Sequence, residues 1–390
     1  MKILHVIPSI GPVRGGPSQA VLAMVKALRE CGVDAEIATT NDNGDTVLDV
    51  PLNQRIEYEQ VPVWFLPRFS PPLKEFIFSA PLTQWLWQHI RDYDLLHTHY
   101  LFSYPSTCAG AIARHQKVPY IVRTIGHLTP WALAQSRLKK QLYAFLIERH
   151  NLNRAAAIHC TSVGEAEDVR NFGIKTPTFT LPLGVNLPVD NLQAKATLHH
   201  RYQIPPDTPV VLFLSRLHYK KRPDLLMRSL SQIAASNPNV HLILAGLGEP
   251  DYVNQLKNLA ISLGLAQRTS FPGFVTGVDK QLLLQGSDIF VLPSFSENFG
   301  IAVAEAMAAR LPVIITPGIQ IAPEITQSQA GLVVAGEADT LAEAIAQLLN
   351  SPNLRQQYGN NGKHLVSHHY SWNAIAQQLT TIYIGMRDEG

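Results

Sequence analysis

Glu297 and Glu305 are two carboxylates that stand eight residues apart in the second half of the chain. The short apolar run 288–293 before them predicts a buried strand, and the alanine-rich run 301–309 predicts a helix. A loop between a strand and a helix can hold an anion, because backbone N–H groups and the positive end of the helix meet there. One carboxylate could bind the hydroxyls of a sugar and the other the ribose of its nucleotide. The alternative is an acidic helix face that water solvates.

Arg216 and Lys221 are two cations at a similar place in the pattern. Arg216 follows the strand-like run 210–214 almost directly, and Lys221 lies five residues further on, near the start of the next helix. A planar guanidinium and a compact ammonium suit a diphosphate, and they would stabilise the charge that develops as a nucleoside diphosphate leaves a sugar. With these cations and a helix N-terminus available, we expect that no metal ion and no cofactor is needed. The alternative is a pair of solvated basic residues.

Paired glycines follow the first predicted strand, in the segment 11–17 (GPVRGGP). This segment does not have the G-x-G-x-x-G spacing, which argues against a nicotinamide dehydrogenase. Gly15 and Gly16 would let the backbone approach a ligand closely. A simple tight turn is the alternative.

Two histidines end the strand-like run 95–99. His97 and His99 alternate along it and therefore share one face of the strand. If that face is the edge of a cleft, His99 is a candidate residue for binding an acceptor. The alternative is a buried, hydrogen-bonded histidine. Zinc binding would need further ligands, which the sequence does not identify.

Strand-like and helix-like runs alternate along the whole chain. The predicted strands are residues 3–8, 35–39, 95–99, 120–124, 157–160, 178–181, 210–215, 240–245, 289–293 and 313–316, and the predicted helices include 19–31, 138–154 and 165–172. This order predicts two doubly wound parallel sheets, whose ligand sites lie at the carboxyl ends of the strands. Prolines, Gly184 and asparagines cluster in 182–206, so we place the domain break there.

Composition limits the remaining possibilities. The chain has 390 residues, of which 46% are hydrophobic and 16% charged, enough for two domains with their own cores. A net charge of +2 gives no electrostatic footprint for nucleic acid. The three distant cysteines indicate reduced thiols, and neither a signal peptide nor a run of eighteen apolar residues is present. We therefore expect a cytoplasmic protein. The aromatic segment 63–90 departs from the alternation and could cover an acceptor pocket, touch a membrane surface or simply pack as an irregular excursion.

The carboxylate pair on its strand, loop and helix resembles the signature of the retaining glycosyltransferases of the GT-B fold, specifically the group 1 type. Residues 213–226 (FLSRLHYKKRPDLL) resemble the strand-Gly-Arg-Leu…Lys-Gly segment of that family, with Ser215 and Arg222 in place of its two glycines. Residues 242–249, 271–275, 331–334 and 370–372 resemble further segments, so the resemblance covers most of the chain.

The resemblance implies two Rossmann-like domains that face each other across a cleft. Residues 1–185 would bind the acceptor, residues 190–370 the donor, and helix 371–387 would pack back onto the first domain. Glu297, Arg216, Lys221 and His127 would be catalytic. The donor would be bound by Glu305, Asn298, Phe299, Gly300, Ile301, Gly246, Phe274, Val275 and Gly16, and the acceptor by Gly15 and His99. Ile125 stands where the family has a basic residue, and we expect His127 to replace it.

The function that the resemblance implies is transfer of a hexose-type sugar, with retention and without a metal, from a UDP-, GDP- or ADP-sugar. The acceptor hydroxyl would belong to a glycan, a glycolipid or a small metabolite, with peripheral contact of the first domain to the inner membrane face as one option. A nucleotide-sugar epimerase on the same fold is one alternative. A non-catalytic sugar-nucleotide-binding subunit is another, which the departures at Ile125 and Leu183 favour.

Overall fold

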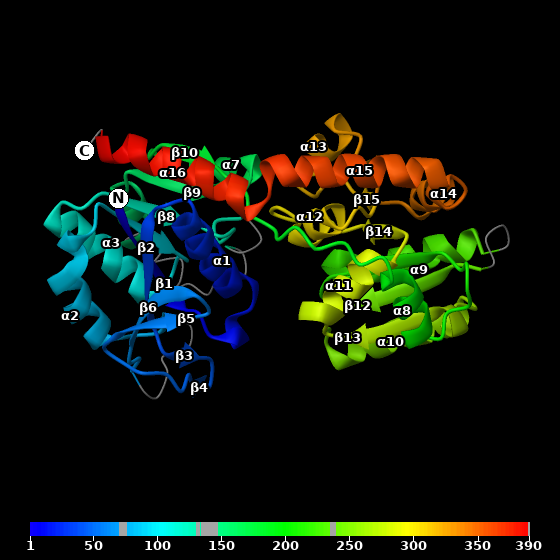
Figure 1. The fold of residues 1–390 in the computed structure, drawn as a ribbon, viewed down its shortest axis with the longest axis horizontal. Helices are drawn as coiled ribbons and strands as arrows, with labels where there is room; N and C mark the ends of the chain where they lie inside the picture. Colours follow the sequence, from blue (N-terminus) through cyan, green and yellow to red (C-terminus); the bar gives the residue numbers. More distant parts are fainter. Residues whose placement is uncertain (70–75, 130–132, 134–146, 235–238, 389–390) are drawn as a thin grey trace. The chain divides into compact units, whose positions relative to one another are not determined.

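The chain folds into two compact units in a computed structural model that describes residues 1–69, 76–129, 133, 147–234 and 239–388 (Figure 1). Unit 1 consists of Met1–Gly184 together with Trp372–Gly390, and unit 2 consists of Val185–Ser371. Each unit contains one large sheet with helices packed against it, and each is described by itself below.

Unit 1 is built on an eight-stranded sheet in the order β10-β9-β8-β7-β1-β2-β6-β5. Its strands are β1 (Lys2–Ser9), β2 (Asp34–Thr40), β5 (Arg55–Tyr58), β6 (Val61–Leu66), β7 (Leu95–His99), β8 (Tyr120–Arg123), β9 (Ala157–Cys160) and β10 (Thr178–Thr180). The strand pairs are parallel except for the β5–β6 pair, which is antiparallel. A separate hairpin joins β3 (Asp42–Asn43) to β4 (Thr46–Val47).

Helices cover both faces of the unit 1 sheet. They are α1 (Gly16–Glu30), α2 (Ala80–His89), α3 (Tyr104–Gln116), α6 (Arg149–Leu152), α7 (Val163–Asn171) and α16 (Trp372–Asp388), with short 3-10 turns η1 (Pro12–Arg14) and η3 (Ile90–Asp92). One apolar core lies under α1 and α16, which run side by side (Figure 1), and the other lies under α2 and α3. Ile375, Leu379 and Tyr383 of α16 are fully buried, so the end of the chain completes the core of unit 1.

The prediction that segment 63–90 departs from the strand–helix alternation is wrong for its described residues. The segment contains most of strand β6 and the whole of helix α2, and residues 70–75 lie outside the described residues. Its aromatic side chains pack within unit 1: Trp85 is buried and lies against Trp64 with ring centroids 5.1 Å apart. Pro67 directly follows β6 and Pro81 lies in the first turn of α2, where proline is tolerated, so these prolines did not signal the elements beside them.

Unit 2 is built on a six-stranded parallel sheet in the order β13-β12-β11-β14-β15-β16. Its strands are β11 (Val210–Leu214), β12 (His241–Ala245), β13 (Thr269–Gly273), β14 (Ile289–Leu292), β15 (Val313–Ile315) and β16 (Gly331–Val333). Its helices are α8 (Ala194–Arg201), α9 (Pro223–Gln232), α10 (Pro250–Ser262), α11 (Gly277–Gly286), α12 (Ile301–Ala308), α13 (Ala322–Gln327), α14 (Ala338–Leu349) and α15 (Pro352–His369), with 3-10 turns η5 (Tyr219–Lys221) and η6 (Ala266–Arg268).

The order of the unit 2 strands sets the place of the site. Chain order runs outward from β11 to β13 on one side and from β14 to β16 on the other, so the direction of winding reverses between β11 and β14. A doubly wound sheet binds its ligand at such a switch point, outside the carboxyl ends of the strands. The predicted fold class, two Rossmann-like parallel-sheet domains, is confirmed.

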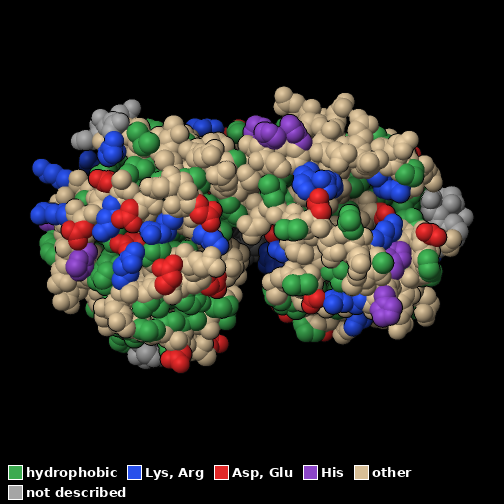
Figure 2. All heavy atoms as spheres, in the orientation of Figure 1, with side chains coloured by type: hydrophobic (Ala, Val, Ile, Leu, Met, Phe, Trp, Pro, Cys, Tyr) green, Lys and Arg blue, Asp and Glu red, His purple; other side chains and the backbone are tan. Residues whose placement is uncertain are grey.

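The surface on the face shown in Figure 2 carries both signs of charge over both units, as expected for a net charge of +2. Among the residues that the structure describes, no helix is both long enough and apolar enough to cross a bilayer.

Candidate active site

The loops after β11 and β14 are joined at the switch point of unit 2. The backbone N–H of Phe295 and the hydroxyl of Ser294 both donate to the carbonyl oxygen of Lys220, at 2.9 and 3.1 Å. These bonds bring the next residue of the first loop, Lys221, against the second loop. The ammonium of Lys221 donates to Oε1 of Glu297 in an ion pair. Two of the sequence-predicted catalytic residues are therefore in direct contact.

The Lys221–Glu297 pair is largely removed from water, with side-chain exposures of 9% and 17%. Burial lowers the pKa of Lys221, whereas the charge of Glu297 acts to raise it. The positive charges of Lys220 and Arg216 add to the lowering of the pKa of Lys221. Breaking a pair in such a place by removing one partner leaves an uncompensated charge, which is strongly unfavourable.

Arg216 lies next to this pair and is exposed. Within the described part of the chain, its guanidinium makes no hydrogen bond or ion pair. Because Arg216 acts electrostatically on Lys221, the two cations belong to one site. The arrangement can receive an anion beside Arg216 and Lys221.

Gly246, at the carboxyl end of β12, allows two backbone segments to approach closely. Its φ is 148°, and a Cβ atom there would lie 1.8 Å from the carbonyl oxygen of Ser215. Phe274 and Val275 follow β13 on the same edge of the sheet, and the Phe274 side chain is 68% exposed. Gly246 thus has a packing role that the sequence reasoning did not identify, beside its predicted contact with a ligand.

The start of α12 supplies the other predicted donor-binding positions. Gly300 caps the helix with φ of 84°, and the N–H groups of Val303 and Ala304 donate to its carbonyl oxygen. Asn298 is half-buried and Phe299 is buried. Ile301, the first helical residue, is 38% exposed and leaves this helix end open at the surface of unit 2.

Glu305 lies one turn into α12 and is also paired with a lysine. Its Oε1 accepts a hydrogen bond from the ammonium of Lys280 of α11 at 2.7 Å, with side-chain exposures of 24% and 28%. The sequence reasoning missed Lys280, because its pairing joins two helices that are 25 residues apart in the chain. Each carboxylate of the pair is therefore matched by one ammonium.

The predicted glycine loop of unit 1 lies at the start of α1. Gly15 has φ of 71°, and its carbonyl oxygen accepts from the N–H groups of Ser18 and Gln19. Gly15 and Gly16 are both exposed, and an added Cβ at either would meet no atom within 4 Å. The positive φ therefore accounts for a glycine at position 15. Neither position needs a glycine to avoid a steric clash within the chain.

His127 is half-buried in the loop after β8. Its Nδ1 accepts from the backbone N–H of Leu101 at 3.2 Å, so the neutral ring carries its proton on Nε2. The ring lies beside Tyr100, with centroids 5.3 Å apart. Ile125 has φ of 51°, which is rare for a β-branched residue, and such strain costs on the order of 1–3 kcal/mol and concentrates at functional sites. The Pro-Trp pair of this motif, residues 130–131, lies outside the described residues.

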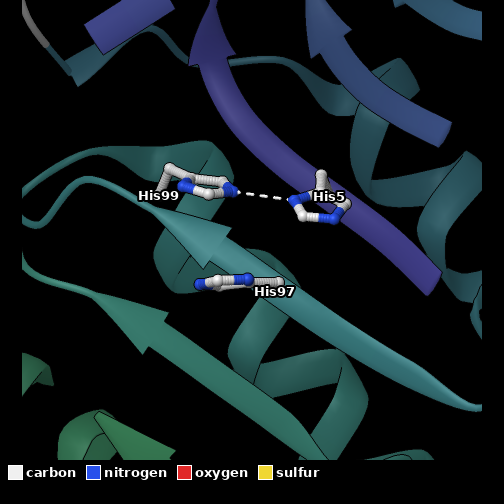
Figure 3. Close-up of side chains that lie close together, drawn as sticks. All are labelled: His5, His97 and His99. Carbon is white, nitrogen blue, oxygen red and sulfur yellow. Dashed lines mark hydrogen bonds between the residues drawn. The ribbon is translucent and has the colours of Figure 1, made fainter. Parts of the chain in front are cut away.

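His99 is fully buried. Its Nε2 lies 3.0 Å from Nδ1 of His5 in a hydrogen bond between β7 and β1 (Figure 3). The structure therefore shows the alternative that the sequence left open, a buried and hydrogen-bonded histidine. His5, which the sequence reasoning missed, follows the same apolar alternation of β1 as Ile3 and Ile7.

His5, His97 and His99 lie close enough together to suggest a metal site, since one nitrogen from each lies within 4.8 Å of the others. The rings of His97 and His99, however, stack with centroids 4.5 Å apart, so their in-plane lone pairs do not converge (Figure 3). Both nitrogens of His97 are also engaged, one with the hydroxyl of Tyr383 at 2.6 Å and one with His159 at 3.3 Å. These three residues do not form a metal site.

The tautomers of this histidine chain follow from its last acceptor. Nε2 of His159 lies 2.8 Å from the carbonyl oxygen of Leu181, which can only accept, so His159 carries its proton on Nε2. Its Nδ1 must then accept from Nε2 of His97, and Nδ1 of His97 must accept from the hydroxyl of Tyr383. The chain ties α16 to the sheet by three directed hydrogen bonds.

The fold and the site define a class: a protein of two Rossmann-like domains, with a carboxylate–lysine site at the switch point of the second sheet. Two families match, and together they span both units. "Glycosyl transferases group 1" matches residues 194–365, and "Glycosyl transferase 4-like domain" matches residues 15–184. The chain belongs to the group 1 glycosyltransferases and has the GT-B fold.

Three similar proteins illustrate the range of relatives. The chain is 27% identical to D-inositol 3-phosphate glycosyltransferase 2 of Catenulispora acidiphila over 394 residues, 95% of this chain and 90% of that one. It is 32% identical to a GDP-mannose-dependent phosphatidylinositol monomannoside mannosyltransferase of Corynebacterium glutamicum over 223 residues, 53% of this chain and 56% of that one. The structure of Anabaena HepE in complex with UDP matches with a TM-score of 0.78 at 21% identity, covering 99% of this chain and 100% of that one.

Proposed function

We propose that this glycosyltransferase transfers a hexose-type sugar from a nucleoside diphosphate sugar to an acceptor hydroxyl, with retention and without a metal ion. The observation that carries the proposal is the contact of Lys221 with Glu297 beside Arg216 at the switch point of unit 2. This arrangement offers cations to a leaving diphosphate and a carboxylate to a sugar within one site. Unit 2 binds the donor in this proposal, and unit 1 binds the acceptor.

In the proposed reaction the diphosphate lies against Arg216 and Lys221, near the open start of α12. Glu297 positions the sugar hydroxyls and Glu305 binds the ribose. The cations stabilise the charge that grows on the leaving oxygen, the term that commonly contributes most to catalysis. The acceptor hydroxyl enters on the side from which the diphosphate departs, which gives retention. A nucleotide-sugar donor is supported by two similar proteins, the Anabaena protein bound to UDP and the GDP-mannose-dependent mannosyltransferase of Corynebacterium glutamicum.

The test begins with the donor. UDP-, GDP- and ADP-sugars are screened by thermal shift, because a ligand that binds the folded state raises the melting temperature by mass action. The donor that binds is then incubated with a panel of glycan, glycolipid and small-metabolite acceptors. We expect transfer, and proton NMR of the product should give the same anomeric configuration as the donor.

Other outcomes would contradict the proposal in distinct ways. An inverted product would exclude retention. Release of a free sugar epimer from donor alone would favour an epimerase. Tight donor binding without turnover over the whole acceptor panel would favour a non-catalytic sugar-nucleotide-binding subunit.

A further inference from the structure

Arg123 is a buried cation that forms no ion pair within the described residues. It is the last residue of β8, its side chain is 1% exposed, and neither Nε nor Nη1 has a hydrogen-bond partner. Burial lowers the pKa of Arg123 to about 10, so the guanidinium stays charged at neutral pH. Buried charges in proteins are normally paired, and an unsatisfied one in a native fold needs an explanation.

The nearest acidic group does not supply that partner. The charge of Glu165 acts on Arg123, but its carboxylate is already bound by other donors. Oε1 accepts from the Thr124 hydroxyl at 2.6 Å and from the Gly126 N–H at 2.5 Å, and Oε2 accepts from the N–H and hydroxyl of Thr161 at 2.6 and 2.7 Å. Within the described ranges, Arg123 therefore forms no ion pair.

Two buried histidines, on β7 and β1, lie near Arg123. His99 is its partner in the β7–β8 register, and the His5–His99 hydrogen bond connects it to β1. Nε2 of His5 and Nδ1 of His99 have no partner. Whichever ring donates in the His5–His99 bond, one unused N–H donor and one unused acceptor remain on the pair. The cluster thus offers donors but lacks an anion.

The position of Arg123 and the two histidines in the fold favours a role in ligand binding over a purely structural role. Arg123 and His99 end neighbouring parallel strands, at the edge where a doubly wound sheet binds ligands. The loops that follow these strands hold Tyr100, Phe102 and Ile125 at φ of 80°, 59° and 51°. Bulky residues at positive φ are uncommon and concentrate at ligand clamps.

We propose that Arg123, with His5 and His99, forms the subsite for an anionic group, a phosphate or a carboxylate, carried by the acceptor. This inference rests on the proposed function only in assigning the anionic group to the acceptor. Binding of an anion at Arg123 itself requires no transfer reaction. A guanidinium binds phosphate and carboxylate through two parallel hydrogen bonds, and such charge-assisted bonds would satisfy the donors that are left unused. A neutral acceptor would leave them unsatisfied.

The test uses inorganic phosphate as the probe and unfolding of unit 1 as the readout. All five tryptophans of the sequence fall within the ranges of unit 1, so urea unfolding followed by tryptophan fluorescence reports that unit. We expect millimolar phosphate, at ionic strength fixed with sodium chloride, to raise the urea midpoint of the wild type. Arg123→Met should abolish this rise, and Arg123→Lys should weaken it.

The sign of the stability change in Arg123→Met separates the proposal from a structural role. Without phosphate, the variant should have a higher urea midpoint than the wild type, because an unpaired buried charge is replaced by an apolar side chain of similar length. A merely structural arginine would give a lower midpoint. A lower midpoint, or a phosphate effect that is equal in both proteins, would overturn the proposal and leave ordered water as the partner of Arg123.

Two controls identify the site and the ligand. The double variant Arg216→Ala/Lys221→Ala removes the cations of unit 2, and the phosphate effect on unit 1 should persist in it. Glucose 6-phosphate and glucuronate should raise the wild-type midpoint, while glucose should not. If phosphate acts only through Arg216 and Lys221, or if glucose acts as well as its anionic forms, the inference is wrong. These unfolding experiments contain no nucleotide sugar, so their outcome does not depend on whether the protein catalyses transfer. Failure of this inference and failure of the proposed function can therefore be told apart.

Discussion

Four fully buried histidines should make the stability of unit 1 depend steeply on pH. His5, His97, His99 and His159 each have no exposed surface. Burial, followed by neighbouring positive charges, lowers the pKa of His5 and of His159 to about 3. The same causes hold the pKa values of His97 and His99 well below 6.5. Arg123 contributes to the lowering of the pKa at all four rings.

The sign follows from which state binds protons. A histidine in the unfolded chain titrates near 6.5, whereas these four stay neutral in the folded protein to a much lower pH. The unfolded state therefore takes up protons first as the pH falls below 6.5, and stability is lost from there toward pH 3. Between pH 7.5 and 5.5 each histidine removes on the order of 1 kcal/mol, so the four together remove on the order of 5 kcal/mol. That loss approaches the whole stability of an ordinary domain, about 5–15 kcal/mol.

The assay is the urea-unfolding free energy of unit 1, from tryptophan fluorescence at pH 7.5 and 5.5 in buffers without phosphate. Glu148 acts in the opposite direction, because burial raises its pKa and the folded protein binds that proton first. Comparing variants removes this background. His159→Gln should shrink the difference in unfolding free energy between the two pH values by on the order of 1 kcal/mol, the share of one buried histidine. His150→Gln, at an exposed position, is the matched control.

Two results would refute the reasoning. If the wild-type free energy of unfolding does not fall at all from pH 7.5 to pH 5.5, although the four histidines outnumber Glu148, the rings accept protons in the folded state. If His159→Gln and His150→Gln have the same pH dependence, burial of His159 does not control its protonation.

Three further predictions concern the site in unit 2. Arg216→Ala and Lys221→Ala should each lower kcat/KM by on the order of 10²-fold, with circular dichroism confirming the fold; near-normal turnover would exclude a diphosphate contact. Activity measured in EDTA should equal that in buffer, since protein cations receive the phosphates, and loss that magnesium or manganese restores would refute metal independence. Glu305→Gln should mainly raise the donor KM, the sign of lost uniform binding, whereas Glu297→Gln should mainly lower kcat. The reverse pattern would exchange the two roles.

The sequence predicted the elements of unit 2 well, because each depends on local composition. The strands β11 and β14 are short apolar runs, and the carboxyl end of each is followed by polar residues. The general rule that ligands bind at the carboxyl ends of parallel strands then placed Arg216 and Glu297 on one edge. The sheet topology alone therefore predicts that Arg216 and Glu297 lie near each other, without knowledge of side-chain positions.

The lysine partners could not be predicted in the same way. Lys221 and Lys280 pair with Glu297 and Glu305 across 76 and 25 residues of sequence. Such pairs depend on how two loops or helices come together in space, and local pattern carries no information on that. The antiparallel β5 was missed for another reason, because the Glu59-Gln60 turn that joins it to β6 lacks the glycine, asparagine or aspartate that marks most tight hairpin turns.

The histidines of unit 1 were misleading for a different reason. Polar residues at the carboxyl end of a parallel strand are expected to face a ligand, and His99 fits that expectation by position. It is fully buried, and its neighbour His97 accepts a hydrogen bond from Tyr383 of α16, which comes from the far end of the chain. Sequence position could locate the edge of the sheet, but not a partner that comes from a distant helix.

The two lysine–carboxylate pairs hold the charged groups of the proposed donor site in place. Arg216 adds a positive charge that no carboxylate pairs within the described residues, so in the proposed mechanism a diphosphate meets a favourable field although the lysines are already paired. In that mechanism Lys221 is shared between Glu297 and the phosphates, whereas Lys280 has no such competitor for Glu305. A shared cation loses part of its interaction with Glu297 when the phosphates arrive and regains it when the diphosphate leaves. In the proposed mechanism, Lys221 therefore connects the charge on the leaving group to the charge on the carboxylate that positions the sugar, and this makes the Lys221–Glu297 contact the central feature of the site.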